Sequence, residues 1–294
     1  MSPSTVTRAV LLGLALAGCG TPAASVGAPP PSVVTPPLPS LHLSLGQPRD
    51  QDPSDDVILD HGVFVVSYNP ARLGPNWVAW RLVASDLGDV DRTDFFHSDP
   101  LLPAGMPGPT KLDYRNSGYD RGHLCPSGDR TASVAANEET FVMTNMEPQV
   151  HALNVGPWEK LETFERQLAR EDRQIFLVAG GLFDAAPTRL AGGEAVPRAS
   201  FKVMVVLERG TGAGAVNEAT TTFAVIMPNT EDVARTDWSD YLVSIDEVER
   251  QSGYDFLSLV APEVQRGLEA RVAPPPARRA RRHSAGQARA NPPS

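Results

Sequence analysis

Polar and charged side chains are concentrated between Arg115 and Arg166, and His123 is the one best suited to proton transfer. It ends the segment Gly118-Tyr119-Asp120-Arg121-Gly122-His123. A neutral imidazole accepts a proton near neutral pH, and an arginine two residues earlier can bind the same anion. The glycine between them is expected to let the backbone turn. An isolated histidine is more often structural, so this motif needs partners elsewhere in the chain.

A second polar cluster runs from Thr144 to Arg166 and offers those partners. In one interpretation Asn154 caps a helix whose first turn contains Pro157. In the other, positions 154, 158, 162 and 166 form an i, i+4 ridge, so Asn154, Glu162 and Arg166 share one side of a helix. The second interpretation presents an amide, a carboxylate and a guanidinium to one ligand.

Together the two clusters resemble the DNA/RNA non-specific endonuclease family, which includes mitochondrial endonuclease G and secreted bacterial nucleases. The resemblance extends from about His61 to about Leu257. It implies a ββα-metal fold, hydrolysis of DNA and RNA, and a Mg²⁺ cofactor that Mn²⁺ can replace. The matching residues are Asp120-Arg121-Gly122-His123, the DRGH motif, then Thr144-Asn145, Pro148-Gln149, Leu153-Asn154, Trp158, Glu162 and Arg166.

The resemblance implies a chemical role for three of these residues. His123 matches the general base, Asn154 the single direct protein ligand of Mg²⁺, and Glu162 a carboxylate that binds the metal through water. These types suit phosphodiester hydrolysis, because a neutral imidazole can deprotonate water near neutral pH. Mg²⁺ held by one neutral amide keeps its full charge to stabilise the phosphate oxygens and the leaving 3′ oxygen.

Three arginines are expected to contact the scissile phosphate. Arg121 and Arg166 match family arginines with that role, and Arg92 is the best match to a third, although its spacing varies within the family. Arginine provides bidentate, permanently charged contacts that stabilise the transition state. Asp120 is expected to hold the loop and Arg121 in place, and Asn145 to support the site from behind.

Contacts confined to phosphate and sugar carry no sequence information, so DNA and RNA are both predicted substrates. Two other functions stay open. One is a catalytically inactive, envelope-anchored nucleic-acid-binding protein that uses Arg278 to Arg282, although such a protein would not need His123. The other is a metal-dependent phosphodiesterase that acts on small nucleotides.

Several other residues could carry chemistry, but a structural role is favoured for each. Cys125 is expected to be a small buried side chain rather than a redox group or nucleophile. A zinc site that uses His123 and His151 would lack further ligands. Trp77 and Trp80 are expected in a core strand, with base stacking as the alternative.

These side chains must be positioned by an α+β domain with helices packed on a mostly antiparallel sheet. A hairpin is predicted over 62–83, because two β-branched runs flank Asn69-Pro70 and Gly74-Pro75. Buried strands are predicted over 174–179, 201–207 and 222–227, and helices over 156–170, 245–248 and 256–270.

The ends of the chain differ in composition from this single domain, predicted over 41–271. Residues 1–19 form an apolar signal peptide that ends in Leu-Ala-Gly-Cys, which resembles a lipobox and implies lipidation of Cys19. Residues 20–40 are predicted to form a Pro-rich tether, and 272–294 a disordered basic tail. The protein is therefore expected to be exported and anchored in the bacterial cell envelope, or secreted if the lipobox is not used.

The charge distribution argues against binding nucleic acid through the body as a whole. The formal net charge is −9, and Arg8 and five arginines of the tail lie outside the predicted domain, which is therefore still more acidic. Nucleic acid must bind to a local arginine cluster or to the tail. The expected partners are DNA, RNA and a membrane, whereas an inhibitor protein and a homodimer are left open.

Overall fold

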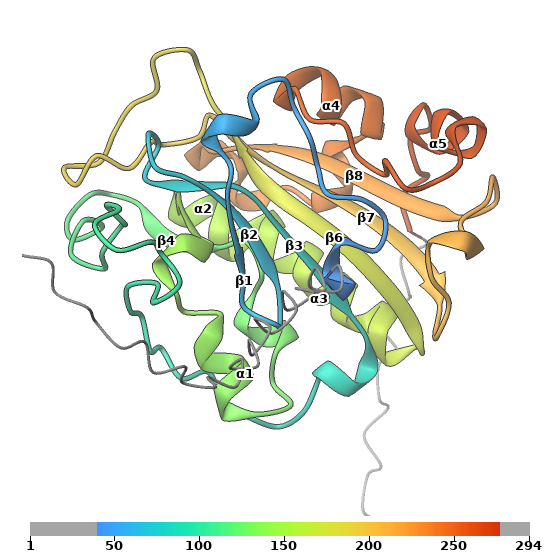
Figure 1. Cartoon of the computed structure of the whole chain (residues 1–294), viewed down its shortest axis with the longest axis horizontal. Helices are drawn as coiled ribbons and strands as arrows, with labels where there is room; N and C mark the ends of the chain where they lie inside the picture. The colour runs from blue at the N-terminus through green and yellow to red at the C-terminus, as the bar shows by residue number, and fades with distance from the viewer. Residues whose placement is uncertain (1–39, 277–294) are drawn as a thin grey trace, which may run out of the picture. The chain divides into compact units, whose positions relative to one another are not determined.

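A seven-stranded antiparallel sheet forms the centre of the computed structural model, which describes residues 40–276 (Figure 1). The strand order is β1-β2-β3-β6-β7-β8-β9. This confirms the predicted mostly antiparallel sheet. The strands are β1 (Val57–Asp60), β2 (Val65–Asn69), β3 (Gly74–Leu82), β6 (Arg173–Leu182), β7 (Ala199–Glu208), β8 (Thr221–Pro228) and β9 (Leu242–Val243).

Both faces of this sheet are buried, which explains why its strands are almost continuously apolar. Alternate residues of a strand point to opposite faces. On β3, Val78 and Trp80 therefore enter one core and Trp77 and Ala79 the other. The Trp80 face packs against α3 (Glu159–Arg170), and the Trp77 face against α4 (Ile245–Ser252) and α5 (Pro262–Glu269). Figure 1 shows α4 and α5 together, away from α3.

The predicted elements are present, with some differences in extent. The hairpin over 62–83 is formed by β2 and β3, and β1 is an additional edge strand that the sequence reading missed. The helix predicted over 245–248 continues further, because α4 extends to Ser252 and is followed by Gly253, whose positive φ of 84° suits a glycine C-cap. The helix predicted over 256–270 was wrong at its start. The next helix starts only at Pro262, so residues 256–261 are not helical.

A smaller unit carries both polar clusters. Strand β4 (Asp120–His123) pairs antiparallel with β5 (Met146–Gln149). The chain then continues through α2 (His151–Leu153) and a π-helical turn (Asn154–Trp158) into α3. The predicted continuous helix over 156–170 was wrong at its start, because Gly156 has non-helical angles of φ −102° and ψ −116°. A short helix, α1 (Val134–Glu139), lies between β4 and β5 in sequence.

The predicted signal peptide with Cys19, nearly all of the tether, and the arginines of the tail lie outside the described residues. The first residues of the predicted tail are described, and Ala273 packs against the core. Within residues 40–276, no helix has both the length and the apolar character needed to cross a membrane.

Candidate active site

The DRGH motif forms strand β4, not the turn that its glycine suggested. Gly122 lies opposite Glu147 in the pairing with β5. A Cβ at this position would collide with the side chain of Gln149. The glycine at position 122 thus lets strand β4 lie close to the Gln149 side chain. Since successive strand residues alternate in direction, Arg121 and His123 point to the same face, as expected for joint contact with one anion.

His123 is nearly buried, at 6% exposed, and its imidazole is held by aromatic rings. Its ring lies edge-on to Phe141, with 4.9 Å between centroids, and tilted against Phe96. The Nε2 atom has no hydrogen-bond partner. Burial, and then the charges of Arg92 and Arg121, lower the pKa of His123 to about 3. The imidazole is therefore neutral at physiological pH and can accept a proton.

A cavity of about 460 Å³ lies in front of His123 and joins the two polar clusters. It brings together all six residues predicted to hold the metal, the water or the phosphate. Its lining consists of Arg92, Arg121, His123, Pro126, Ser127, Gly128, Asn154, Val155, Glu159, Glu162 and Arg166. The i, i+4 interpretation thus correctly placed Asn154, Glu162 and Arg166 together, even though the helix between them is interrupted.

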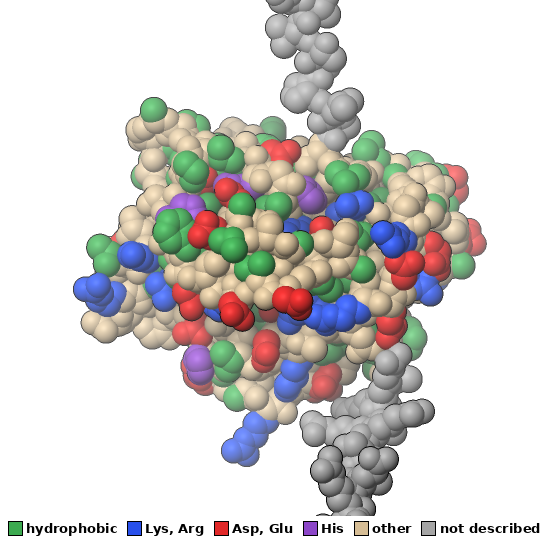
Figure 2. Space-filling model, turned by 90° about the horizontal axis from the view of Figure 1, so that it is seen from below, with side chains coloured by type: hydrophobic (Ala, Val, Ile, Leu, Met, Phe, Trp, Pro, Cys, Tyr) green, Lys and Arg blue, Asp and Glu red, His purple; other side chains and the backbone are tan. Residues whose placement is uncertain are grey.

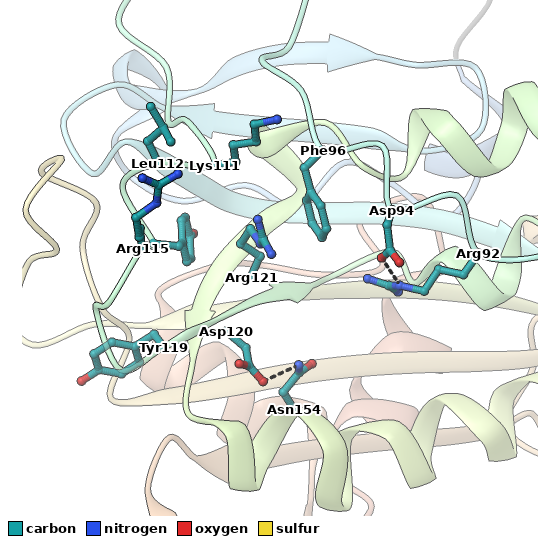
Figure 3. A pocket seen from close by; sticks show the side chains of 11 residues that line it. Arg92, Asp94, Phe96, Lys111, Leu112, Arg115, Tyr119, Asp120, Arg121 and Asn154 are labelled. Carbon is teal, nitrogen blue, oxygen red and sulfur yellow. Dashed lines mark hydrogen bonds and ion pairs between the residues drawn. The ribbon is translucent and has the colours of Figure 1, made fainter.

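Asn154 is not a helix N-cap, because its own backbone is helical at φ −57° and ψ −49°. Its amide Nδ2 donates a hydrogen bond to Asp120 Oδ2 at 3.0 Å. The same carboxylate oxygen is 2.8 Å from His151 Nδ1. The contacts of Asp120 thus differ from the expected contact with Arg121. By binding Nδ2, Asp120 leaves the amide Oδ1 of Asn154 free as an oxygen ligand (Figure 3).

Two carboxylates complete an all-oxygen donor set beside Asn154. Glu162 was predicted, whereas Glu159, one helical turn earlier, was missed although its i, i+3 spacing could have revealed it. Burial raises the pKa of Glu162 to about 8, against the lowering effects of Lys202 and Arg166. Amide and carboxylate oxygens suit a hard divalent cation such as Mg²⁺. The donor chemistry and the orientation of the Asn154 amide therefore fit Mg²⁺.

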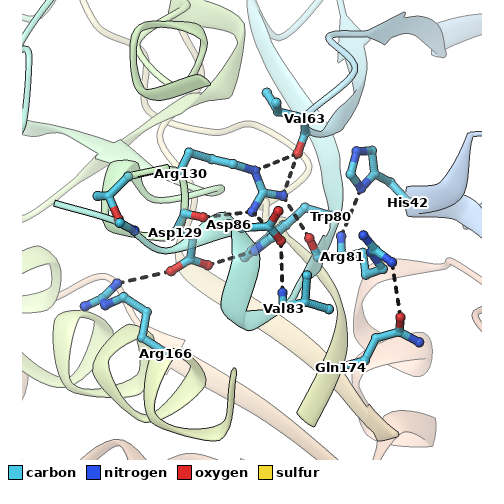
Figure 4. Close-up of polar contacts among 12 residues, drawn as sticks. His42, Val63, Trp80, Arg81, Val83, Asp86, Asp129, Arg130, Arg166 and Gln174 are labelled. Atoms are coloured by element: carbon cyan, nitrogen blue, oxygen red, sulfur yellow. Dashed lines mark hydrogen bonds and ion pairs between the residues drawn. The ribbon is translucent and has the colours of Figure 1, made fainter. Parts of the chain in front are cut away.

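Arg166 is fixed by a buried aspartate that no sequence pattern indicated (Figure 4). Its Nη1 lies 3.3 Å from Oδ1 of Asp129. The other oxygen of Asp129 accepts a hydrogen bond from Trp80 Nε1 at 3.0 Å. A Cβ on Gly128 would lie 2.9 Å from the same Nη1, so a glycine leaves room for the guanidinium. Trp80 thus connects the central sheet to a cavity residue, and its predicted place in the core is confirmed.

The other two arginines are held by aromatic rings in front of the cavity (Figure 3). The guanidinium of Arg121 lies 4.0 Å from the ring centroid of Phe96, and that of Arg92 4.8 Å from Phe141. Such stacking holds a guanidinium without neutralising it. Arg92 also donates hydrogen bonds to Asp94 at 2.6 Å and to Ser127 at 3.0 Å.

A second cavity of about 460 Å³ shares Arg92, Arg121 and Asn154 with the first. It adds the basic side chains of Lys111 and Arg115 and the aromatic rings of Phe96, Tyr114 and Tyr119. Figure 2 shows basic and acidic side chains interspersed over one face of the molecule. Within this mixed surface, five basic side chains line the two cavities, although the composition is acidic overall.

The remaining predictions concern structural residues. Cys125 is fully buried, and burial raises the pKa of its thiol. Asn145 holds the backbone just after the motif, because its amide exchanges two hydrogen bonds of 2.9 Å with Cys125. The zinc alternative finds no ligand set, since within residues 40–276 His123 and His151 share no cluster of three potential ligands. Trp77 is fully buried, as predicted.

The low pKa of His123 leads to a testable expectation for the protein free of substrate. The His123 imidazole should remain neutral between pH 5 and 8, because its pKa of about 3 lies well below this range. Its ring-proton NMR shifts should stay constant there. Assignment would come from the His123→Gln spectrum, and a His123 midpoint near pH 6.5 would contradict the expectation.

Comparison with known proteins identifies the family of this chain. Residues 44–263 match the family model described as DNA/RNA non-specific endonuclease. The chain is 38% identical to a nuclease of Nostoc sp. over 262 residues, which cover 87% of this chain and 94% of the relative. It is 33% identical to human mitochondrial endonuclease G over 209 residues, covering 66% of this chain and 67% of the relative.

A solved structure gives the same result for the fold. A chain in the crystal structure of the EndoG/EndoGI complex superimposes with a TM-score of 0.63 and 26% identity, covering 76% of this chain and 92% of that one. The predicted α+β, ββα-metal fold is thereby confirmed, with β4, β5 and the helix that follows as its ββα unit. This chain therefore belongs to the DNA/RNA non-specific endonuclease family, and it is a nuclease that hydrolyses phosphodiester bonds.

Proposed function

We propose that this nuclease cleaves DNA and RNA with little sequence preference in a Mg²⁺-dependent reaction in which His123 is the general base. The observation that carries the proposal is the shared cavity. A neutral imidazole with an unpaired Nε2 lies in the same space as an oriented asparagine amide and three arginines.

His123 would remove a proton from the attacking water. Its pKa of about 3 in the free protein is low for a base, but Arg92 and Arg121 contribute to this lowering. An anionic phosphodiester bound between these two guanidiniums would offset their charge, so the basicity of His123 should rise when substrate binds. The aromatic rings of Phe96 and Phe141 would keep the imidazole aligned toward the water.

Asn154 would bind Mg²⁺ directly through Oδ1, with Glu162 contacting it through water and Glu159 close to the same waters. The cation supplies Lewis-acid stabilisation of the phosphate and of the leaving 3′ oxygen. Asp120 would keep the Asn154 amide in the ligating orientation. Arg166, fixed by Asp129, and the stacked Arg92 and Arg121 would stabilise the charge that builds up on the phosphate.

The lining of the cavities supports a polymeric substrate and low sequence preference. Guanidinium groups recognise phosphate, which is the same at every position of DNA and RNA. The adjoining cavity with Lys111 and Arg115 extends the basic lining beyond the scissile phosphate. It also offers aromatic rings that can stack on any base. A small nucleotide would leave this second cavity unused.

The proposal is tested by incubating the purified chain with supercoiled plasmid, with single-stranded RNA and with a dinucleotide. With Mg²⁺ we expect nicking and degradation of both polymers at many positions, with Mn²⁺ able to substitute and EDTA abolishing cleavage. The dinucleotide should react far more slowly. Cleavage that persists in EDTA, that is confined to one polymer, or that favours the dinucleotide would overturn the proposal.

Asp120→Ala should weaken Mg²⁺ binding without removing a metal ligand. Loss of the acceptor for Asn154 Nδ2 frees the amide to rotate, and loss of such supporting contacts typically lowers metal affinity about 10- to 100-fold. The Mg²⁺ concentration that gives half-maximal plasmid cleavage should rise by about that factor, and high Mg²⁺ should restore most of the rate.

Asp94→Ala is the matched control for this variant. Asp94 lies on the same adjoining cavity but pairs with Arg92 instead of Asn154. Its removal should leave the Mg²⁺ dependence unchanged. An identical Mg²⁺ shift in both variants would show that charge in the cavity, rather than orientation of Asn154, sets the affinity.

We further propose that the chain is exported and anchored through a lipid on Cys19, a residue outside the described part of the chain. The support is the apolar run and the Leu-Ala-Gly-Cys sequence. Membrane fractionation and mass spectrometry should find a mature chain that begins at lipidated Cys19, and Cys19→Ala should lose the lipid. An unmodified Cys19 in the membrane-free fraction would overturn this proposal. A homodimer and an inhibitor protein stay predictions.

A further inference from the structure

Three carboxylates meet where the two C-terminal helices lie together. Asp246 and Glu249 are three residues apart on α4, and Glu269 is the last residue of α5. One oxygen atom of each carboxylate lies within 4.8 Å of the others. These helices cover the face of the sheet opposite α3, so the cluster is separate from the nuclease cavity (Figure 1).

Glu269 distinguishes this cluster from ordinary surface acids. The residue is only 5% exposed, and its Oε1 is buried without a hydrogen-bond partner. A buried carboxylate oxygen normally has a donor or a cation beside it, because its desolvation is otherwise unfavourable. The unpaired Oε1 atom thus points to a missing positive partner.

The charged groups near the three carboxylates are negative and do not provide a positive partner. Among residues 40–276, no lysine or arginine forms an ion pair with any of the three carboxylates; the neighbouring arginine on α4, Arg250, pairs with Glu247. Burial, followed by the charge of Glu249, raises the pKa of Glu269 to about 8, against the lowering effect of Gln265 and with smaller raising effects of Asp255 and Asp246. Three carboxylates held this close without a cation would repel one another if all were ionised.

We propose that Asp246, Glu249 and Glu269 bind a divalent cation of the size of Ca²⁺ that joins α4 to α5. All three ligands are hard oxygens, which excludes the thiolate and imidazole environment that zinc prefers. Two oxygens that bind one Ca²⁺ at about 2.4 Å can be at most about 4.8 Å apart, and the three oxygens here lie within that distance of one another. The exposed Asp246 leaves an open side for water ligands and for entry of the ion.

The role of such an ion would be structural. Ile245 and Val248 of α4 and Leu268 of α5 are part of the core on this face of the sheet. A cation held by both helices would stabilise their packing without contacting the cavity of His123. Ligand binding to the folded state alone raises its stability.

The test measures thermal unfolding of the full chain in EDTA, in CaCl₂ and in MgCl₂. At about 100 times its dissociation constant, Ca²⁺ should raise Tm by about 5–10 °C for a domain of this size, and more than Mg²⁺ does. Glu269→Gln, which removes the buried charge but keeps the shape, should abolish the Ca²⁺ shift. Its Tm in EDTA should be close to that of the wild type, because without a cation the raised pKa leaves the Glu269 carboxyl largely protonated near neutral pH.

Three further variants locate the ion. Asp246 is exposed, so the variant Asp246→Asn should fold normally, yet it should reduce the Ca²⁺-induced rise in Tm. Asn154→Ala, which alters the nuclease cavity, and Glu263→Gln, an exposed acid on the same helix α5, should retain the shift. The proposal is overturned if the wild type shows no Ca²⁺ shift, if the shift survives in Glu269→Gln, or if Asn154→Ala alone removes it.

Discussion

His123→Ala is expected to cleave supercoiled plasmid and RNA about 10²- to 10⁴-fold more slowly than the wild type, the range usual for loss of a general base. The substitution removes the proton acceptor but leaves the arginines and the oriented Asn154 in place. Substrate binding should therefore change much less than the rate. Single-turnover cleavage in saturating Mg²⁺ measures the chemical step, and a filter-binding assay in EDTA measures affinity.

Two comparisons separate a lost base from a damaged fold. His97→Ala removes a histidine outside the cavity and should cut like the wild type. His123→Gly leaves a gap between Phe96 and Phe141 that added imidazole can enter, and rescue should increase with the neutral fraction of imidazole as pH rises. Wild-type rates in His123→Ala would refute the base assignment, and loss of both binding and rescue in His123→Gly would show that the fold, rather than the base, had failed.

Much of the fold could be predicted from the sequence because local patterns and burial agree there. The strands β6, β7 and β8 are apolar runs between glycine and proline clusters, and a strand buried on both faces must have that composition. The helical segment before α3 was harder to predict. Its residues have helical spacing, but the break at Gly156 depends on packing of the π-helical turn against residues near Ala234, far along the chain.

Spacing within single elements predicted part of the site, and the family resemblance linked that part to Arg92, Arg121 and His123. Asn154, Glu162 and Arg166 share a helical ridge, whose spacing is visible in the sequence. Asp129 gave no such signal, because its contacts to Arg166 and Trp80 join a loop, a helix and a strand that are distant in sequence.

The orientation of Asp120 was equally hidden. Its partner Asn154 becomes a neighbour only when α2 follows the β4–β5 pair. Supporting contacts of this kind come from tertiary packing, so spacing rules for single elements do not reveal them.

A buried ion pair anchors helix α3, which carries part of the site, to the sheet. The variant Lys202→Met should show how much this pair contributes to the free energy of unfolding. Lys202 on β7 and Glu165 on α3 are both fully buried, with 2.9 Å between Nζ and Oε1. The ammonium also lies 4.5 Å from the Trp158 ring centroid. Removing one partner of a buried pair leaves an uncompensated charge, so unfolding in urea at pH 7 should show a loss of about 3–5 kcal/mol.

The same variant should become relatively more stable as pH falls, and this dependence identifies the cause. Burial already raises the pKa of Glu165 in the wild type, and the charge of Lys202 opposes that rise. Without Lys202 the folded-state pKa lies still higher above the unfolded value, so the folded variant binds one more proton than the unfolded chain. Between pH 7 and 5 the deficit should therefore shrink as pH falls, by at most about 1.4 kcal/mol per pH unit, which is the slope for one whole additional proton.

A double variant and a variant of an exposed ion pair serve as controls for Lys202→Met. Lys202→Met combined with Glu165→Leu removes both charges, so stability should return to within about 1 kcal/mol of the wild type or exceed it. Arg173→Met breaks an ion pair with Glu208 that is largely exposed, and it should cost less than about 1 kcal/mol. Glu165 lies on α3 between Glu162 and Arg166, so the pair also fixes the rotation of that helix. If the double variant is stable yet needs more Mg²⁺ for cleavage, the ion pair serves to orient the cavity residues. If the double variant cleaves normally, apolar packing orients these residues equally well.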